Sequence, residues 1–147
     1  MINLSKFAET LCDLMFEHDN MTAKALAEEL GIPAPTITRY RKAQHVPTVD
    51  NLVKIADYFH RSTDFLLGLE EENLSLTFKP CPPFSEQLIF LTKYFKDNYC
   101  NFYHTLEIPE STFFEWKNGS SKPSLESIEK IADYFGRRID FILGRET

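Results

Sequence analysis

Lys54-Ile-Ala-Asp-Tyr-Phe59 returns unchanged as Lys130-Ile-Ala-Asp-Tyr-Phe135, 76 residues later in the chain. The match is longer than these six residues. When residues 46–70 are aligned with residues 122–146 without a gap, 13 of the 25 positions are identical. The same offset places Ile32-Pro33 on Ile108-Pro109. A repeat of this length indicates that the chain holds two copies of one module of about 65 residues.

Composition agrees with two small helical domains. A chain of 147 residues divides into two modules near the lower size limit for a self-sufficient core, and an aromatic content of 14% supplies buried area. No run of apolar residues approaches the length of a membrane span, and the N-terminus has no signal-peptide pattern, so we expect no membrane association. The net charge of −6 argues against indiscriminate nucleic-acid binding, so such a role would need a local basic patch.

The three cysteines have neither close pairing nor metal-ligand spacing, which predicts buried thiols in a reducing cytosol and no metal site. The four histidines are scattered, and the chain has no glycine-rich phosphate loop and no nucleophile constellation. The sequence therefore predicts that the protein is not an enzyme and binds no cofactor.

Helical spacing dominates both copies. Phe7, Leu11 and Leu14 begin the pattern in the first copy, and Phe84, Leu88 and Leu91 repeat it in the second. Residues with side chains that cap helix N-termini precede several helices, namely Thr22, Thr48, Ser62 and Ser124. Glycines that can end helices follow them at Gly31, Gly68, Gly119, Gly136 and Gly144. No strand pattern competes, so the fold class is all-α.

The domain organisation follows from the repeat. We expect two five-helix domains, at residues 1–68 and 84–147. The segment between them, residues 69–83, begins acidic and ends Lys79-Pro-Cys-Pro-Pro83, which is typical of a linker that prolines stiffen in its second half.

One stretch of the first copy, residues 22–48, reads Thr-Ala-Lys-Ala-Leu-Ala-Glu-Glu-Leu-Gly-Ile-Pro-Ala-Pro-Thr-Ile-Thr-Arg-Tyr-Arg-Lys-Ala-Gln-His-Val-Pro-Thr. A helix of eight residues, a glycine, a short turn and a second helix form the helix-turn-helix layout. Together with the Ile-Ala-Asp-Tyr-Phe block, this stretch closely resembles the Xre/Cro/lambda-repressor-like helix-turn-helix family. The resemblance covers about 120 of the 147 residues and implies two tandem lambda-repressor-like domains.

The resemblance also implies a core and a DNA-binding face. The core is expected to contain Leu26, Leu30, Ile32, Ile37, Tyr40, Leu52, Ile55, Phe59, Phe65 and Leu66. In this family the outer face of the third helix enters the major groove, and the second helix's N-terminus and the loop after the third helix hold phosphates. Base contacts are therefore expected from Ala34, Pro35, Thr38 and Arg39. Phosphate contacts are expected from Thr22, Thr36, Arg41, Lys42, Gln44 and His45.

Charge supports this assignment independently of the resemblance. No acidic residue lies between Glu29 and Asp50, whereas Arg39, Arg41 and Lys42 cluster there. Ala34 and Pro35 cannot donate to base edges, although either could pack on a thymine methyl group, so Arg39 is the side chain equipped for a bidentate guanine contact. The family usually carries a polar residue at the position of Ala23, and its hydrogen bond is missing in this chain.

The second copy departs from the pattern at the corresponding positions. The base-facing residues become Glu110, Ser111, Phe114 and Glu115, and carboxylates are mostly repelled by the phosphates that line the groove. Glu107 replaces Gly31 and would need a costly left-handed conformation. Phe114 falls at an exposed position, and exposed aromatic side chains are common at protein interfaces. The second copy is therefore expected to mediate pairing, with Phe114 in the interface.

Two functions from different classes remain open. The first is a sequence-specific DNA-binding transcriptional regulator, expected to be a repressor, that reads double-stranded DNA with the first copy and assembles as a homodimer through the second. The alternative is a protein-interaction module, antirepressor-like, with little DNA affinity. The second copy runs almost to Thr147, so we expect no separate effector domain and no small-molecule effector. The resemblance implies a cytoplasmic, nucleoid-associated protein that is bacterial or phage-encoded.

Overall fold

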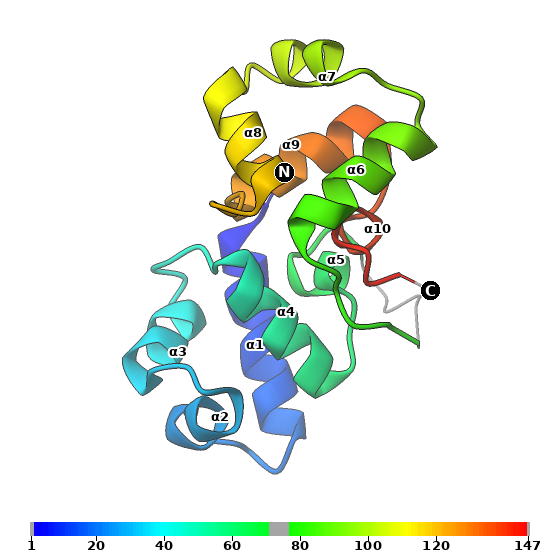
Figure 1. Cartoon of the computed structure of the whole chain (residues 1–147). Helices are drawn as coiled ribbons and strands as arrows, with labels where there is room; N and C mark the ends of the chain where they lie inside the picture. The colour runs from blue at the N-terminus through cyan, green and yellow to red at the C-terminus, as the bar shows by residue number, and fades with distance from the viewer. Residues whose placement is uncertain (1, 71–76, 147) are drawn as a thin grey trace. The chain divides into compact units, whose positions relative to one another are not determined.

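The computed structural model describes residues 2–70 and 77–146, which form two compact units, Met1–Leu76 and Thr77–Thr147 (Figure 1). Each unit contributes five of the ten helices in the described part of the chain, and the β-structure there is a single isolated bridge. The predicted all-α fold class is therefore confirmed. None of the described helices is long and apolar enough to cross a membrane.

Unit 1 contains α1 (Leu4–Glu17), α2 (Ala23–Leu30), α3 (Ala34–Arg41), α4 (Val49–Phe59) and α5 (Thr63–Leu66). Side-chain oxygens cap four of the five helices by accepting hydrogen bonds from amides of the first turn. The predicted caps are confirmed: Thr22 accepts from Ala25, Thr48 accepts from Asn51, and Ser62 accepts from Phe65. Asn3 caps α1 in the same way. These local bonds fix where the four capped helices start.

The core of unit 1 gathers the inward faces of its helices. Phe7, Leu11, Leu26, Leu52 and Ile55 are fully buried. Two residues expected in the core are only half-buried, Leu30 and Phe65. Leu30 is the last residue of α2, and the side chain of Phe65 lines a groove beside α1, so neither is enclosed on all sides. Leu67 is fully buried just beyond α5.

Unit 2 contains α6 (Phe84–Tyr94), α7 (Tyr99–Thr105), α8 (Glu110–Asn118), α9 (Leu125–Phe135) and α10 (Ile139–Leu143). The first residues of α7 to α10 lie 76 positions after the first residues of α2 to α5. Phe113 and Trp116 are buried at the positions of Ile37 and Tyr40. Ser124 caps α9 as predicted, and Glu107 has the predicted left-handed conformation with φ of 56°.

The end of unit 2 pairs with residues expected in the linker. Phe78 forms the isolated bridge with Glu146, and the Lys79 amide donates to the Arg145 carbonyl at 3.0 Å. The fully buried Arg145 guanidinium lies over the Phe78 ring and donates to the equally buried Asp140 carboxylate at 3.0 Å. Phe78 and Lys79 are therefore tied to unit 2. Residues 71–76 of the expected linker lie outside the described residues.

Cysteine burial differs from the sequence expectation. Cys12 is half-buried, and Cys81 and Cys100 are exposed. The prediction of buried thiols is therefore wrong for the last two. The apolar character of a cysteine side chain does not by itself predict burial. Cys81 lies between two prolines before α6, and Cys100 lies on the outer side of α7, so both are exposed.

Candidate nucleic-acid interface

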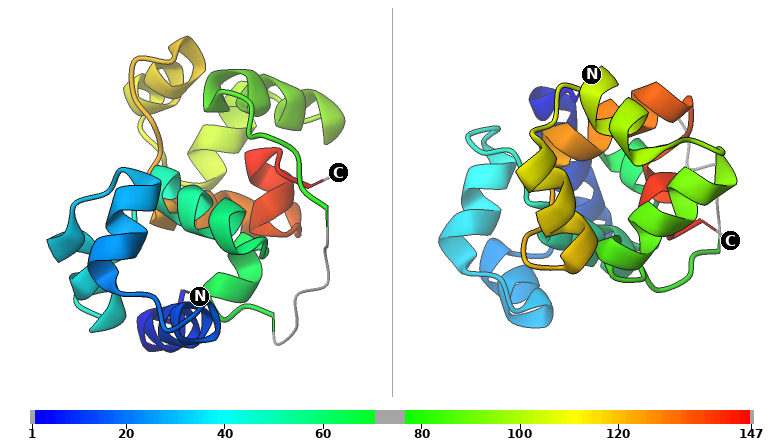
Figure 2. Two further views of the ribbon diagram at one scale, coloured as in Figure 1. Left: turned by 90° about the horizontal axis from the view of Figure 1, so that it is seen from below. Right: turned by 45° about the horizontal axis from the view of Figure 1, so that its top comes forward.

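The helix-turn-helix of unit 1 is built from α2, Gly31 and α3. Gly31 has φ of 67°, a left-handed conformation that turns the chain out of α2, and a Cβ at this position would meet no atom within 4 Å. Buried Ile32 then anchors the turn, and Pro33 starts α3. The two helices pack against each other, as both views in Figure 2 show. The turn is therefore set by backbone conformation rather than by side-chain crowding.

Buried residues on one side of α3 determine which residues its other side presents. Ile37 is fully buried and Tyr40 is 3% exposed; the Tyr40 ring packs edge-on against Phe7. The Tyr40 hydroxyl also accepts a hydrogen bond of 2.9 Å from the Asn51 amide of α4. Packing against α1 and α2, together with the hydrogen bond from α4, thus holds α3 in a single orientation.

The four residues expected to face bases lie away from that buried side. Pro35 and Arg39 are exposed, and Ala34 and Thr38 are half-buried. Their spacing along α3 places them on adjoining strips of the helix surface. The structure thus brings these four residues to one face of a rigidly held helix.

The residues expected to contact phosphates flank this face. Arg41, Lys42, Gln44 and His45 are exposed at the end of α3 and in the loop after it. Ala43 adopts a left-handed conformation with φ of 57°, and the Gln44 amide donates back to the Arg39 carbonyl at 3.0 Å. This motif fixes the start of the loop that carries the polar side chains. The exposed basic surface consists of Arg39, Arg41, Lys42, Gln44 and His45, and the sequence from residue 30 to residue 49 contains no acidic residue.

Two threonines use their hydroxyls differently. The Thr22 oxygen accepts from the Ala25 amide at 3.1 Å, which leaves its hydroxyl proton able to donate to a phosphate. Thr38 instead donates its hydroxyl proton to the Ala34 carbonyl at 3.2 Å, one turn earlier in α3. Thr36 is half-buried in the first turn of the helix. The difference between Thr22 and Thr38 could not be predicted from the sequence, because the two side chains are chemically identical.

The equivalent helix of unit 2 has a different surface. Glu110, Ser111 and Glu115 are exposed on α8, and the Glu115 carboxylate accepts from the Ser121 hydroxyl at 3.3 Å. Between residues 106 and 125 the chain carries three glutamates and two lysines. Tyr103 is buried at the position of Ala27; its hydrogen bond with Cys100 and its burial raise the pKa of the Tyr103 hydroxyl to about 12.

Phe114 is less accessible than the sequence indicated. It is half-buried, its ring packs edge-on against Phe113 with centroids 5.3 Å apart, and the Lys117 ammonium lies 5.7 Å from its centroid. The expectation of an exposed side chain is therefore wrong. Its neighbours on α8 cover part of the ring because Lys117 follows it by one helical turn.

A larger exposed aromatic surface lies elsewhere on unit 2. Phe90 and Tyr94 of α6 are 46% and 50% exposed, and both rings contact Phe141 of α10. The Arg137 guanidinium lies over the Tyr94 and Phe141 rings. We call Phe90, Tyr94 and Phe141 the aromatic patch. Sequence reasoning missed it, although Phe90 and Tyr94 are four residues apart and so lie on one face of α6.

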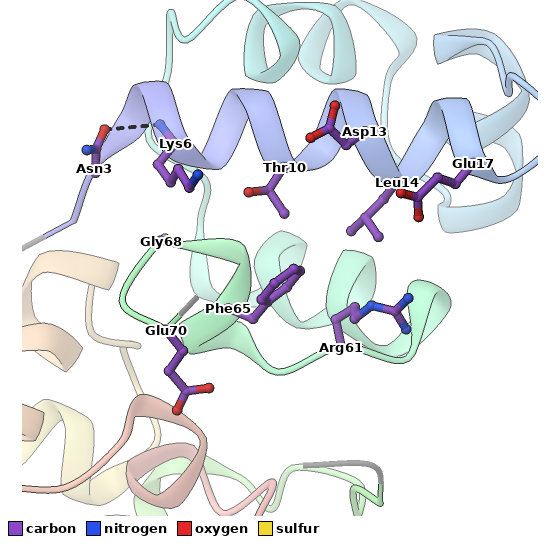
Figure 3. A pocket seen from close by; sticks show the side chains of 10 residues that line it. All are labelled: Asn3, Lys6, Thr10, Asp13, Leu14, Glu17, Arg61, Phe65, Gly68 and Glu70. Atoms are coloured by element: carbon purple, nitrogen blue, oxygen red, sulfur yellow. Dashed lines mark hydrogen bonds between the residues drawn. The ribbon is translucent and has the colours of Figure 1, made fainter. Parts of the chain in front are cut away.

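The corresponding face of unit 1 is a polar groove. It encloses about 640 Å³ between α1 and the segment around α5, with Leu14 and Phe65 as apolar walls and Glu17 and Arg61 at its rim (Figure 3). None of its lining residues belongs to α2 or α3. The groove thus lies apart from the candidate DNA-binding face.

The described residues contain no group of three or more side chains suited to holding a metal ion.

Comparison with known proteins agrees with the geometry of unit 1. Residues 16–66 match a protein-family model described as helix-turn-helix, so this part of the chain is a helix-turn-helix domain. The cryptic phage CTXphi transcriptional repressor RstR of Vibrio cholerae is 35% identical over 72 residues; the aligned region covers 46% of this chain and 64% of that protein. No solved structure matched the chain.

Proposed function

We propose that this protein is a sequence-specific DNA-binding transcriptional regulator that reads double-stranded DNA with α3 of unit 1. The similarity to the repressor RstR makes repression the preferred mode. The observation that carries the proposal is the exposed basic surface of α3 and its following loop, on a helix-turn-helix domain within a chain of net charge −6. A cation cluster of this kind is the electrostatic footprint of a phosphate-binding face.

In the proposed binding mode, some side chains contact base edges and others contact phosphates. Arg39 contacts a guanine, Ala34, Pro35 and Thr38 lie along neighbouring base edges, and Arg41 and Lys42 neutralise phosphates. The remaining phosphate contacts come from Thr22, Thr36, Gln44 and His45. Thr22 is suited to this role because its hydroxyl proton stays available after the oxygen has capped α2.

A salt titration of the full chain tests the proposal. Arg41→Ala and Lys42→Ala should each weaken binding to specific and random duplexes alike, and each should reduce the slope of log affinity against log salt by about 1. Lys130→Ala, a change in unit 2, is the control and should leave the slope unaltered. Salt-independent binding, or no binding to any duplex selected from a random library, would exclude the proposed function.

Unit 2 is proposed to assemble the protein rather than to read DNA. The carboxylates of Glu110 and Glu115 would face the phosphates if α8 entered a major groove as α3 is proposed to do. Unit 2 also carries the exposed rings of Phe90 and Tyr94. We propose that two chains pair through unit 2, with the aromatic patch and Phe114 as the candidate contact surfaces. Such a dimer would present two copies of α3 to half-sites about 34 Å apart.

A protein-interaction module with little DNA affinity is the second candidate. Two observations favour it: Ala23 offers no side-chain hydrogen bond at the start of α2, and the chain as a whole is acidic. An antirepressor-like protein would use the same aromatic surfaces for a different protein. The two candidates separate in the titration described above, because this one predicts no sequence-selected duplex that binds more tightly than random DNA.

A further inference from the structure

The hydrogen-bond donors of the base-facing surface of α3 are concentrated at one end. Ala34 and Pro35 have no polar side-chain atoms, and proline also lacks a backbone N–H. Thr38 would ordinarily be a donor, but its hydroxyl donates to the Ala34 carbonyl at 3.2 Å. Among the four base-facing residues, Arg39 is then the one whose side-chain donors are not used within the helix, and its side chain is exposed.

The internal hydrogen bond also fixes how Thr38 is oriented. A threonine that bonds the carbonyl four residues earlier is held in one rotamer about its Cα–Cβ bond. Its methyl group occupies another staggered position on Cβ and takes no part in that hydrogen bond. Thr38 is half-buried on the same side of α3 as Ala34, with Pro35 exposed beside them. The surface ahead of Arg39 therefore offers methyl and methylene groups and no free side-chain donor, and the Thr38 oxygen keeps only its acceptor lone pairs.

Such a surface suits one feature of the major groove. Thymine presents a 5-methyl group there beside its O4 acceptor, whereas guanine, adenine and cytosine present donors and acceptors but no methyl group for an apolar surface to contact. We infer that Ala34, Pro35 and Thr38 select thymine through its 5-methyl group, next to a guanine read by Arg39. This inference rests on the proposed function and names the base class that the same face recognises.

Removing single methyl groups from the DNA tests the inference. A duplex selected by the full-length protein would be remade with deoxyuridine in place of one thymidine at a time, which removes the 5-methyl group and keeps base pairing. At one or more thymines beside the contacted guanine, affinity should fall about fourfold, the value expected for one buried methyl group. Replacing cytosine by 5-methylcytosine in a weakened site, where thymine was changed to cytosine, should recover part of the loss.

Two variants of Thr38 show which of its groups reads the base. Thr38→Ser keeps the hydroxyl and removes the methyl group, so it should lose about fourfold in affinity and become insensitive to deoxyuridine at one position. Thr38→Val keeps a methyl group and removes the hydroxyl, so it should retain both affinity and deoxyuridine sensitivity. Thermal unfolding of both variants checks that the domain stays folded.

Each outcome bears on a different part of the account. Tight binding to a selected duplex with no sensitivity to deoxyuridine at any position would overturn the inference and leave the proposed function intact. Loss of affinity in Thr38→Val with retention in Thr38→Ser would also overturn it, because the hydroxyl would then be the reading group. Failure to bind any selected duplex would instead remove the proposed function on which the inference rests.

Discussion

At the residue scale, Arg39 carries the proposed hydrogen-bonded recognition of DNA. It is exposed on α3, and its planar guanidinium can bond both guanine acceptors in the major groove. Arg39→Ala should therefore cost about 1–3 kcal/mol in binding to the selected duplex and relax the preference at one base pair. The measurement is a titration against duplexes that vary at each position in turn.

The repeat supplies a matched control for Arg39. Glu115 occupies the equivalent position on α8, so Glu115→Ala should leave DNA affinity unchanged or raise it slightly by removing a negative charge. Equal losses from both substitutions would mean that the two helices contact DNA similarly. An affinity that does not respond to Arg39→Ala would remove Arg39 from the reading surface.

At the scale of the helices, the turn after α7 is strained where the turn after α2 is not. Glu107 has φ of 56°, and its counterpart Gly31 has φ of 67°. A side chain in this conformation costs about 1–2 kcal/mol, whereas glycine adopts it freely. Glu107→Gly should thus raise the free energy of unfolding of unit 2 by up to about 1 kcal/mol after the entropy lost by glycine is counted. Gly31→Glu should destabilise unit 1. Calorimetry would contradict this explanation if both changes had the same sign.

The start of α7 is tied to α9 by a tyrosine. The Tyr134 hydroxyl donates to the Asp97 carboxylate at 2.7 Å, and this hydrogen bond is the main reason that the pKa of Tyr134 is raised. Tyr134→Phe should cost about 1–2 kcal/mol of stability at neutral pH. Because the folded pKa is raised, the stabilisation is complete below the ordinary tyrosine pKa of about 10 and is lost as pH rises through the folded value.

The pH dependence distinguishes this hydrogen bond from simple packing. The difference in unfolding free energy between wild type and Tyr134→Phe should shrink above about pH 10. Tyr58→Phe in unit 1 is the matched control, since the Tyr58 hydroxyl faces a His18 nitrogen at 3.3 Å rather than a carboxylate. A difference that stays constant from neutral to alkaline pH would assign the effect of Tyr134 to packing.

Local chemistry explains which elements could be predicted from the sequence. The caps at Thr22, Thr48 and Ser124 depend on one side chain and an amide three residues away, so a short window of sequence was sufficient. The same holds for the left-handed Glu107, which the repeat aligned with a glycine. The four base-facing positions lie on one face because helical periodicity sets their directions.

Contacts between distant residues explain what could not be predicted. The pairing of Phe78 with Glu146 joins opposite ends of unit 2, and no local pattern indicates it. The incomplete burial of Phe65 depends on how far α1 covers α5. The hydroxyl bond of Thr38 is a choice between rotamers that the sequence leaves open.

At the scale of the whole molecule, the proposed assembly depends on aromatic side chains of unit 2. Phe90 and Tyr94 are 46% and 50% exposed, whereas the positions that match them in unit 1, Asp13 and Glu17, are charged. We predict a dimer at micromolar concentration that Tyr94→Asp weakens at least tenfold, measured by sedimentation. Phe114→Asp should weaken it as well if α8 shares the interface.

The result for the dimer has two clear readings. A wild-type protein that sediments as a monomer across this range would contradict homodimer formation and favour a different protein partner. Glu17→Tyr, which places the tyrosine of position 94 at the matching position of unit 1, is the control for non-specific self-association. If it strengthened self-association as much as Tyr94→Asp weakened it, exposed aromatic area alone would account for the effect.

The division of labour between the units is the central claim, and one measurement addresses it directly. Each unit has its own helices and buried core, so residues 1–76 and residues 77–147 can be made separately and checked for helical structure by circular dichroism. Both fragments would be titrated with a random duplex at two salt concentrations, beside the full chain. Residues 1–76 should retain most of the salt-dependent affinity, and residues 77–147 should bind little. Comparable binding by the two folded fragments, or binding by residues 77–147 alone, would contradict the claim that α3 of unit 1 is the DNA-reading helix.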